Sequence, residues 1–219
     1  MADDISGFID PSLQMQAMHS ASSVVLAVRL LGLVLIMMSI SHDNAMGKTS
    51  SIFGSLLVCG SFMLTGHTAS SSLRWGLAPL LTIHVTIAAF WFGALMPLYL
   101  ISIRETSIIA AQVTAAFSQI AFWLVPCILI AGSLLGLALV RHLAEFSTDY
   151  GLSLIMKFAG FSVLMGLAAL NKWRLGPAIA TGNARALKSF RRSLCAEYLL
   201  IATVLSVTAV MTTLYSPEP

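Results

Sequence analysis

Long runs of apolar residues, separated by short polar segments, dominate this chain. Each run is long enough to cross the apolar core of a bilayer as a helix, which takes about 20 residues. Barrel strands do not fit, because they alternate polar and apolar positions over about 10 residues. The pattern predicts an all-α, polytopic transmembrane helical bundle with about six spans, at residues 22–41, 49–66, 76–102, 113–140, 151–170 and 194–215.

Composition supports the same fold class. Hydrophobic residues make up 58% of the 219 positions and charged residues only 10%, whereas a soluble domain carries about 25% charged residues. We therefore expect a tail at residues 1–21 and a single transmembrane domain at residues 22–215. The acidic tail lacks the basic segment of a cleaved signal peptide, so the first span is expected to direct insertion.

The distribution of basic residues predicts the orientation. The segment 171–193 and the other loops on its side carry eight Lys and Arg residues, and the opposite loops carry only Arg74 and Arg141. Basic residues accumulate in loops that stay inside the cell. Both termini are therefore expected on the outer, periplasmic side of a bacterial inner membrane. The net charge of +3 reflects this topology, so lipid rather than nucleic acid is the expected environment.

Hydrolytic enzyme signatures are missing from the sequence. There is no HExxH, GxxxxGK[ST] or GxSxG motif and no pair of spaced carboxylates within a span. The three cysteines form no CxxC pair, which gives no indication of a disulfide framework or a thiolate metal site. We do not expect an enzyme.

His84 is the most informative single residue. No Asp, Glu, Lys or Arg occurs between Arg74 and Arg104, so its imidazole lies inside an apolar span, in the outer half of the membrane. An ionisable side chain is costly there and is by default a candidate for function. Imidazole is also a ligand for transition metals and for haem iron.

Methionine and histidine residues near the outer side suggest a copper site. Met63 and His67 are four residues apart and share a helix face, and the next span, with His84, follows after a short loop. Thioether and imidazole together suit Cu(I). In the tail, Met18 and His19 could capture copper, or this segment could be an amphipathic lead-in to the first span. Packing is the alternative role for Met63, and solvation for His67.

Three charged residues fall within spans, namely Arg29, Lys157 and Glu197. The first two lie at outer-half depths, from which long side chains can reach the interface. Glu197 is expected near the inner end of the last span. There it is either a partner for a basic residue (Lys172, Arg174 or Arg192) or a group that helps a cation move inward. Trp91, seven residues after His84, either walls a site or packs in the core.

Several segments, taken in order, resemble the copper resistance protein D (CopD) family from about residue 66 to the C-terminus. They are GH at 66–67, HVTIAAFWFGAL at 84–95, YGLSLIMK at 150–157, ALNK at 169–172, RRSLCAE at 191–197 and SP at 216–217. The resemblance implies an inner-membrane protein that moves copper from periplasm to cytoplasm, with a periplasmic copper-binding partner of the CopC type. It draws attention to His67, His84, Trp91, Lys157, Asn171 and Glu197.

Two other functions stay open at this stage. The first is a haem-b electron carrier, in which His67 or His142 would face His84 as the second axial ligand. The second is an accessory factor that delivers copper to a membrane metalloenzyme with the same ligands. In a copper permease, movement would be passive or coupled to an ion gradient, and His84, His67, Met63, Met18 and His19 would be the metal ligands.

Overall fold

The computed structural model describes residues 21–64, 73–139 and 149–214, which are helical over nearly their whole length and contain no strand. The chain divides into two compact units, residues 1–86 and 87–219. Long helix α5 (Arg74–Arg104) contributes residues to both. The predicted all-α helical bundle is confirmed.

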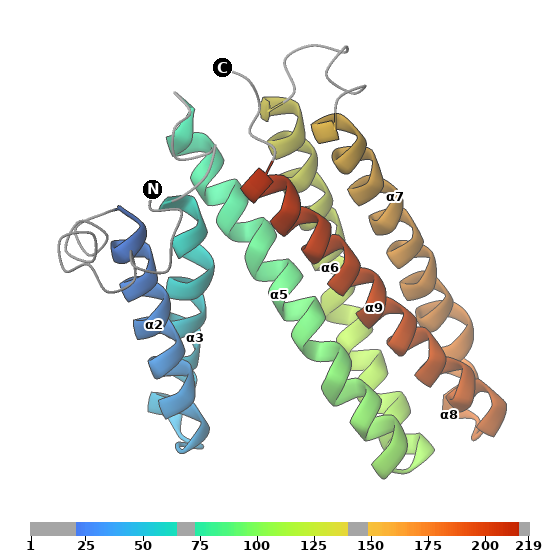
Figure 1. The fold of residues 1–219 in the computed structure, drawn as a ribbon. Coiled ribbons are helices and arrows are strands. Elements are labelled where there is room, and N and C mark those ends of the chain that lie inside the picture. Colours follow the sequence, from blue (N-terminus) through green and yellow to red (C-terminus); the bar gives the residue numbers. More distant parts are fainter. Residues whose placement is uncertain (1–20, 65–72, 140–148, 215–219) are drawn as a thin grey trace, which may run out of the picture. The chain divides into compact units, whose positions relative to one another are not determined.

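The first unit is built on a helical hairpin. Helices α2 (Ala21–Ile40) and α3 (Ala45–Gly60) lie side by side (Figure 1). The side chain of Asn44 begins α3, because its Oδ1 accepts a hydrogen bond of 3.0 Å from the Gly47 amide and so caps a free helix donor. A short 3-10 helix, η2 (Ser61–Leu64), continues from α3.

Two glycines allow α2 and α3 to approach closely. A Cβ atom on Gly32 would lie 2.7 Å from the Gly54 carbonyl oxygen, and one on Gly54 would lie 2.5 Å from the Gly32 carbonyl oxygen. Lipid is as apolar as leucine, so membrane helices associate largely through such close backbone packing. The hairpin therefore depends on having no side chain at either position.

The second unit contains the remainder of α5 and five further helical segments. These are α6 (Ser107–Leu139), α7 (Asp149–Leu170), the π-helical turn η4 (Asn171–Leu175), α8 (Gly176–Ala180) and α9 (Ala184–Leu214). Helices α7 and α9 pack together (Figure 1). The buried core is drawn mainly from α5 and α9, and includes Trp91, Leu95, Leu98, Phe190, Leu194 and Ile201.

One contact ties α9 to α5 near their polar ends. Arg191 Nε donates hydrogen bonds to the Ser102 carbonyl oxygen at 3.0 Å and to Ser102 Oγ at 3.3 Å, and Nη2 also donates to that carbonyl. Ser102 is completely buried. The guanidinium thus uses a carbonyl that has no partner in the last turn of α5.

Within the described residues, five helices are long and apolar enough to cross a membrane, by length and composition. They correspond to the expected first, third, fourth, fifth and sixth spans. The expected span at 49–66 contains α3, which has only 16 residues, and then η2. Together α3 and η2 extend about 32 Å, close to the thickness of the apolar core. The protein is a polytopic membrane protein.

The basic segment 171–193 was expected to be a loop, and this is wrong. Helix runs through η4 and α8 to Ala180, and α9 begins at Ala184. Only Thr181–Asn183 interrupts it, with Gly182 at a φ of 79°, which glycine adopts without strain. Hydropathy marks where polar residues begin, whereas Ala, Leu, Lys and Arg all favour helix and let it continue beyond the apolar run.

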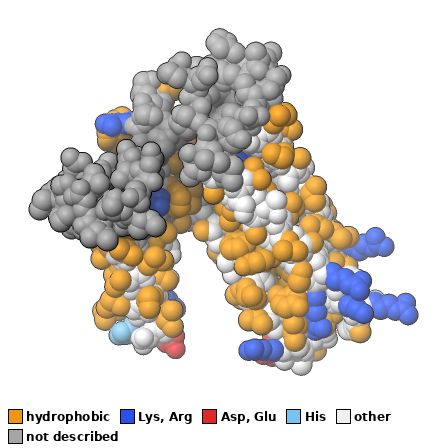
Figure 2. Space-filling view, viewed as in Figure 1, with side chains coloured by type: hydrophobic (Ala, Val, Ile, Leu, Met, Phe, Trp, Pro, Cys, Tyr) orange, Lys and Arg blue, Asp and Glu red, His pale blue; other side chains and the backbone are white. Residues whose placement is uncertain are grey.

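Exposed basic residues gather at one end of the second unit (Figure 2). They lie where α5 ends, where α7 continues into η4, and where α9 begins, and they are Arg104, Arg174, Arg185, Lys188 and Arg192. This is the end expected to face the cytoplasm by the positive-inside rule.

Replacing Gly32 or Gly54 with alanine should destabilise the hairpin. Each new methyl group would meet a backbone carbonyl, so the helices must separate, at a cost of about 1–3 kcal/mol as for other overpacked cores. Thermal unfolding in detergent would measure the loss.

Gly60→Ala, in the same helix α3, is the matched control. Nothing lies within 4 Å of a Cβ at Gly60, so this change should leave the unfolding temperature unaltered or slightly raised. Equal effects of all three substitutions would contradict the close-packing explanation.

Candidate functional site

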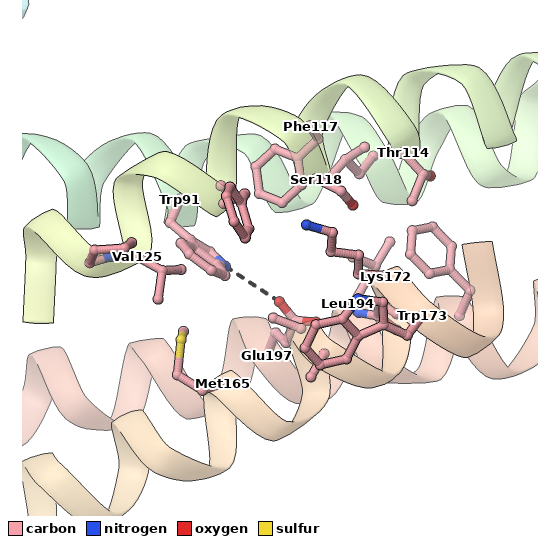
Figure 3. A pocket seen from close by; sticks show the side chains of 18 residues that line it. Trp91, Thr114, Phe117, Ser118, Val125, Met165, Lys172, Trp173, Leu194 and Glu197 are labelled. Carbon is pink, nitrogen blue, oxygen red and sulfur yellow. Dashed lines mark hydrogen bonds between the residues drawn. The ribbon is translucent and has the colours of Figure 1, made fainter. Parts of the chain in front are cut away.

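A buried carboxylate lies at the centre of the second unit. Glu197, on α9, is 2% exposed and belongs to a candidate membrane span. One carboxylate oxygen, Oε1, accepts a hydrogen bond of 2.5 Å from Asn171 Nδ2. The other, Oε2, accepts one of 3.4 Å from Trp91 Nε1, drawn as a dashed line in Figure 3. Both donors are neutral, and no Lys or Arg side chain is seen to bond the carboxylate within the described part of the chain.

Three elements bring these groups to one depth. Trp91 lies about 20 Å before the end of α5, and Glu197 about 20 Å after the start of α9. Those two helix ends carry the contact between Arg191 and Ser102, so the residues meet at the same level of the bundle. Asn171 opens the π-helical turn after α7 and is 6% exposed. Such turns are rare and occur frequently at functional sites.

A cavity of about 400 Å³ opens beside the carboxylate. Its walls come from α5, α6, α7, η4 and α9 and are mostly apolar, with the Trp91 ring edge-on to Phe117 at 5.9 Å between centroids. Side chains labelled in Figure 3 surround this space. The polar side chains that line it, besides Trp91, are Thr114, Ser118, Asn171, Lys172 and Glu197.

Lys172 lines the same cavity as Glu197, but its ammonium group contacts an aromatic ring. Its Nζ atom lies 4.2 Å from the centroid of the Phe122 ring, a cation–π contact. Arg174 and Arg192 are exposed. No ion pair between Glu197 and any of these three residues is seen in the part of the chain that the structure describes. The reason is the early start of α9, which carries Glu197 away from the basic end.

Two polar residues of the cavity, Thr114 and Ser118, were missed from the sequence. They are four residues apart on α6, so they share one face of an otherwise apolar span. This spacing was the available signal. Lys157, in contrast, was expected among the important positions, but it lies about 21 Å along α7 from Asn171. It is not part of this cluster.

The structure describes only some of the expected copper ligands. His67, Met18 and His19 lie outside the described residues. Met63, in η2, has its sulfur 3.9 Å from Thr82 Oγ1 on α5. Thr82 and His84 are two residues apart and so leave the helix on nearly opposite sides. The first unit therefore brings Met63 to α5, but to the face away from the half-buried His84.

The described residues contain no preformed cluster of metal or haem ligands. No group of three His, Cys, Asp or Glu side chains is placed to hold a metal there. Apart from His84, the one described histidine is His42, which is exposed and has Nδ1 3.0 Å from the Met38 carbonyl oxygen. His67 and His142, the expected second haem ligands, lie outside the described residues.

Arg29, the third charged residue within a span, has a structural role. Its Nε donates a hydrogen bond of 2.8 Å to Ser61 Oγ, and its guanidinium lies 4.3 Å from the Phe62 ring centroid. These contacts join α2 to η2. They give the guanidinium one hydrogen-bond acceptor and one aromatic face within the first unit.

Comparison with known proteins gives one match. Residues 111–211 match a family model described as Copper resistance protein D. No curated protein and no solved structure matches the chain. The matched segment includes Lys157, Asn171 and Glu197. His84 and Trp91 precede it, so the resemblance noted before residue 111 stays a prediction.

Asn171→Leu should destabilise the second unit. It removes the closest donor from a buried carboxylate, and hydrogen bonds to charged groups contribute about 1.5–3 kcal/mol. The free energy of unfolding in detergent would fall by about this amount. In a Glu197→Gln background the same substitution should lower the free energy of unfolding by less, because residue 197 then carries no charge.

Ser118→Ala is the matched control, since Ser118 lines the same cavity without bonding Glu197. Its effect should stay within about 0.5 kcal/mol, as for other minor substitutions. If Asn171→Leu cost no more than Ser118→Ala, the hydrogen bond would not be a source of stability.

Proposed function

We propose that this chain, which matches the copper resistance protein D family model over residues 111–211, carries copper across the bacterial inner membrane from periplasm to cytoplasm. The match supports a copper-handling membrane protein. Transport, its direction and the inner-membrane location are the steps that we add. Copper is the cargo in this proposal, and the protein performs no chemical transformation on it.

The observation that carries the proposal is the match to the copper resistance protein D family model, and the buried carboxylate of Glu197 adds a feature typical of ion transport. A charged group inside the membrane is costly, and such groups characteristically mark ion pathways. Charged side chains that are fully buried are usually paired with an opposite charge. Glu197 instead has two neutral donors and faces a cavity. A negative charge held in this way attracts cations, which supports cation movement through the second unit.

His84 is our candidate for the principal copper ligand. It lies in α5 between residues that are almost all apolar, and its imidazole suits either oxidation state of copper. His67, Met63, Met18 and His19 are the further ligands that we propose on the outer side, from the types and spacing of these residues. A periplasmic copper-binding protein of the CopC type would supply the ion to them.

Haem binding gains no support from the described residues. Bis-histidine ligation needs two histidines on facing helices at one depth. The described alternative to His84 is the exposed His42, at the opposite end of the α2–α3 hairpin from Arg29 and Ser61. His67 and His142 lie outside the described residues, and we favour copper over haem b because the matching family model is that of a copper resistance protein.

The transport proposal can be tested with right-side-out membrane vesicles loaded with a Cu(I)-chelating dye. Vesicles that contain the protein should accumulate copper, and His84→Ala should reduce the initial rate at least about tenfold, because loss of a first ligand removes the site. Metal analysis of the purified protein should show about one copper per chain, lost in the same variant.

His42→Ala is the matched control, because it removes an exposed histidine and should leave uptake unchanged. Copper binding without uptake would favour delivery to another enzyme over transport. A Soret band in the visible spectrum of the purified protein would identify a haem carrier and overturn the proposal.

A further inference from the structure

We propose that the cavity beside Glu197 binds a hard monovalent cation, Na⁺ or K⁺, and that this site is separate from the copper ligands. Cation binding is inferred from the structure of the second unit alone. The further role of this cation as the coupling ion for copper movement rests on the proposed function. The site comprises Glu197, Asn171, Ser118 and Thr114, four residues that line the one cavity and carry oxygen atoms in their side chains.

The first argument is the charge balance of the site. Glu197 is 2% exposed, and its two hydrogen-bond donors are neutral. Lys172 is the only basic residue among those lining the cavity, and its ammonium group rests on the Phe122 ring. A carboxylate buried without a cation is unfavourable in an apolar medium. A mobile positive charge in the cavity would balance it.

The second argument is an oxygen atom without a partner. Asn171 Oδ1 is buried and makes no hydrogen bond within the described structure, although Nδ2 of the same amide binds Glu197. Buried polar atoms are nearly always satisfied, so an exception needs an explanation. A cation bound by both side chains would balance the carboxylate charge and satisfy Oδ1.

Hydroxyl groups can complete the coordination. Thr114 Oγ1 donates its proton to the Ala110 carbonyl oxygen at 2.7 Å, which leaves its oxygen lone pairs available. Ser118 lies one turn further along the same face of α6. With a cavity of about 400 Å³, there is also room for water molecules to fill the remaining positions.

The donor atoms select the class of ion. All the candidate ligands are oxygens, and the lining contains no histidine and no cysteine. Oxygen ligands suit hard cations, whereas Cu(I) prefers thioether, thiolate and imidazole. Met165 is the single sulfur-containing residue in the lining. The cavity is thus poorly suited to copper and well suited to an alkali cation, whose gradient could drive transport.

Trp91 provides an internal reporter for the experiment. It is 3% exposed and bonds Glu197, whereas Trp75, Trp123 and Trp173 are each more than 70% exposed. Replacing the other three with phenylalanine leaves Trp91 as the single tryptophan. Its emission should change saturably with NaCl or KCl in purified, copper-free protein, and not with choline chloride at equal ionic strength. Separate NaCl and KCl titrations show which ion is preferred.

Substitutions then assign the response to the site. Glu197→Gln should abolish it, and Asn171→Ala and Ser118→Ala should each weaken the apparent affinity at least about threefold. Glu105→Gln removes an exposed carboxylate at the turn between α5 and α6 and should change nothing. Circular dichroism checks that each variant is folded. If Glu197→Gln does not fold, the Asn171→Ala and Ser118→Ala titrations decide.

Three results would overturn the inference. They are an equal response to choline, a response to pH with none to Na⁺ or K⁺, and no response at all. The second would assign a proton, not a metal cation, to Glu197. Because copper is absent throughout, the outcome does not depend on whether the protein transports copper. Conversely, copper uptake tests only the transport proposal. Its loss in His84→Ala would neither support nor contradict the cation site.

Discussion

Burying a carboxylate among membrane helices is the constraint on which the second unit depends. Glu197 cannot exchange its lost water for lipid, so the protein must supply the donors. They come from elements far apart in sequence, Trp91 on α5 and Asn171 at the end of α7. Satisfying one side chain therefore fixes how three helical segments meet. The π-helical turn at Asn171 and the contact between Arg191 and Ser102 hold this arrangement at its basic end.

The first unit solves helix association differently. Its hairpin relies on contact between backbones at Gly32 and Gly54, and on the contact of Arg29 with Ser61 and the Phe62 ring. Neither kind of contact requires a cavity. Both kinds matter for the same reason, because apolar side chains gain little when they leave lipid to pack against one another. Small residues and satisfied polar groups then decide which helices pair.

The candidate sites of the two units also differ in chemistry. The expected copper ligands, His84 and Met63 among the described ones, belong to the first unit and are soft or borderline donors. The cavity of the second unit offers oxygen atoms around a carboxylate. Separating the two ligand types would let the protein distinguish a soft cargo ion from a hard coupling ion without competition.

The sequence alone determined the class of protein, because a bilayer imposes a minimum length and a lack of charge on every span, and both are readable from residue order. It also singled out Trp91, Asn171 and Glu197, although as positions of a family resemblance and without partners. Only the tertiary structure joined these three, because hydrogen bonds between distant helices leave no periodic signal. It also showed that 171–193 is mostly helical, since hydropathy marks polarity and not where a helix ends. The cavity, and the role of Thr114 and Ser118 in it, depend on how four helices pack, which no single segment encodes.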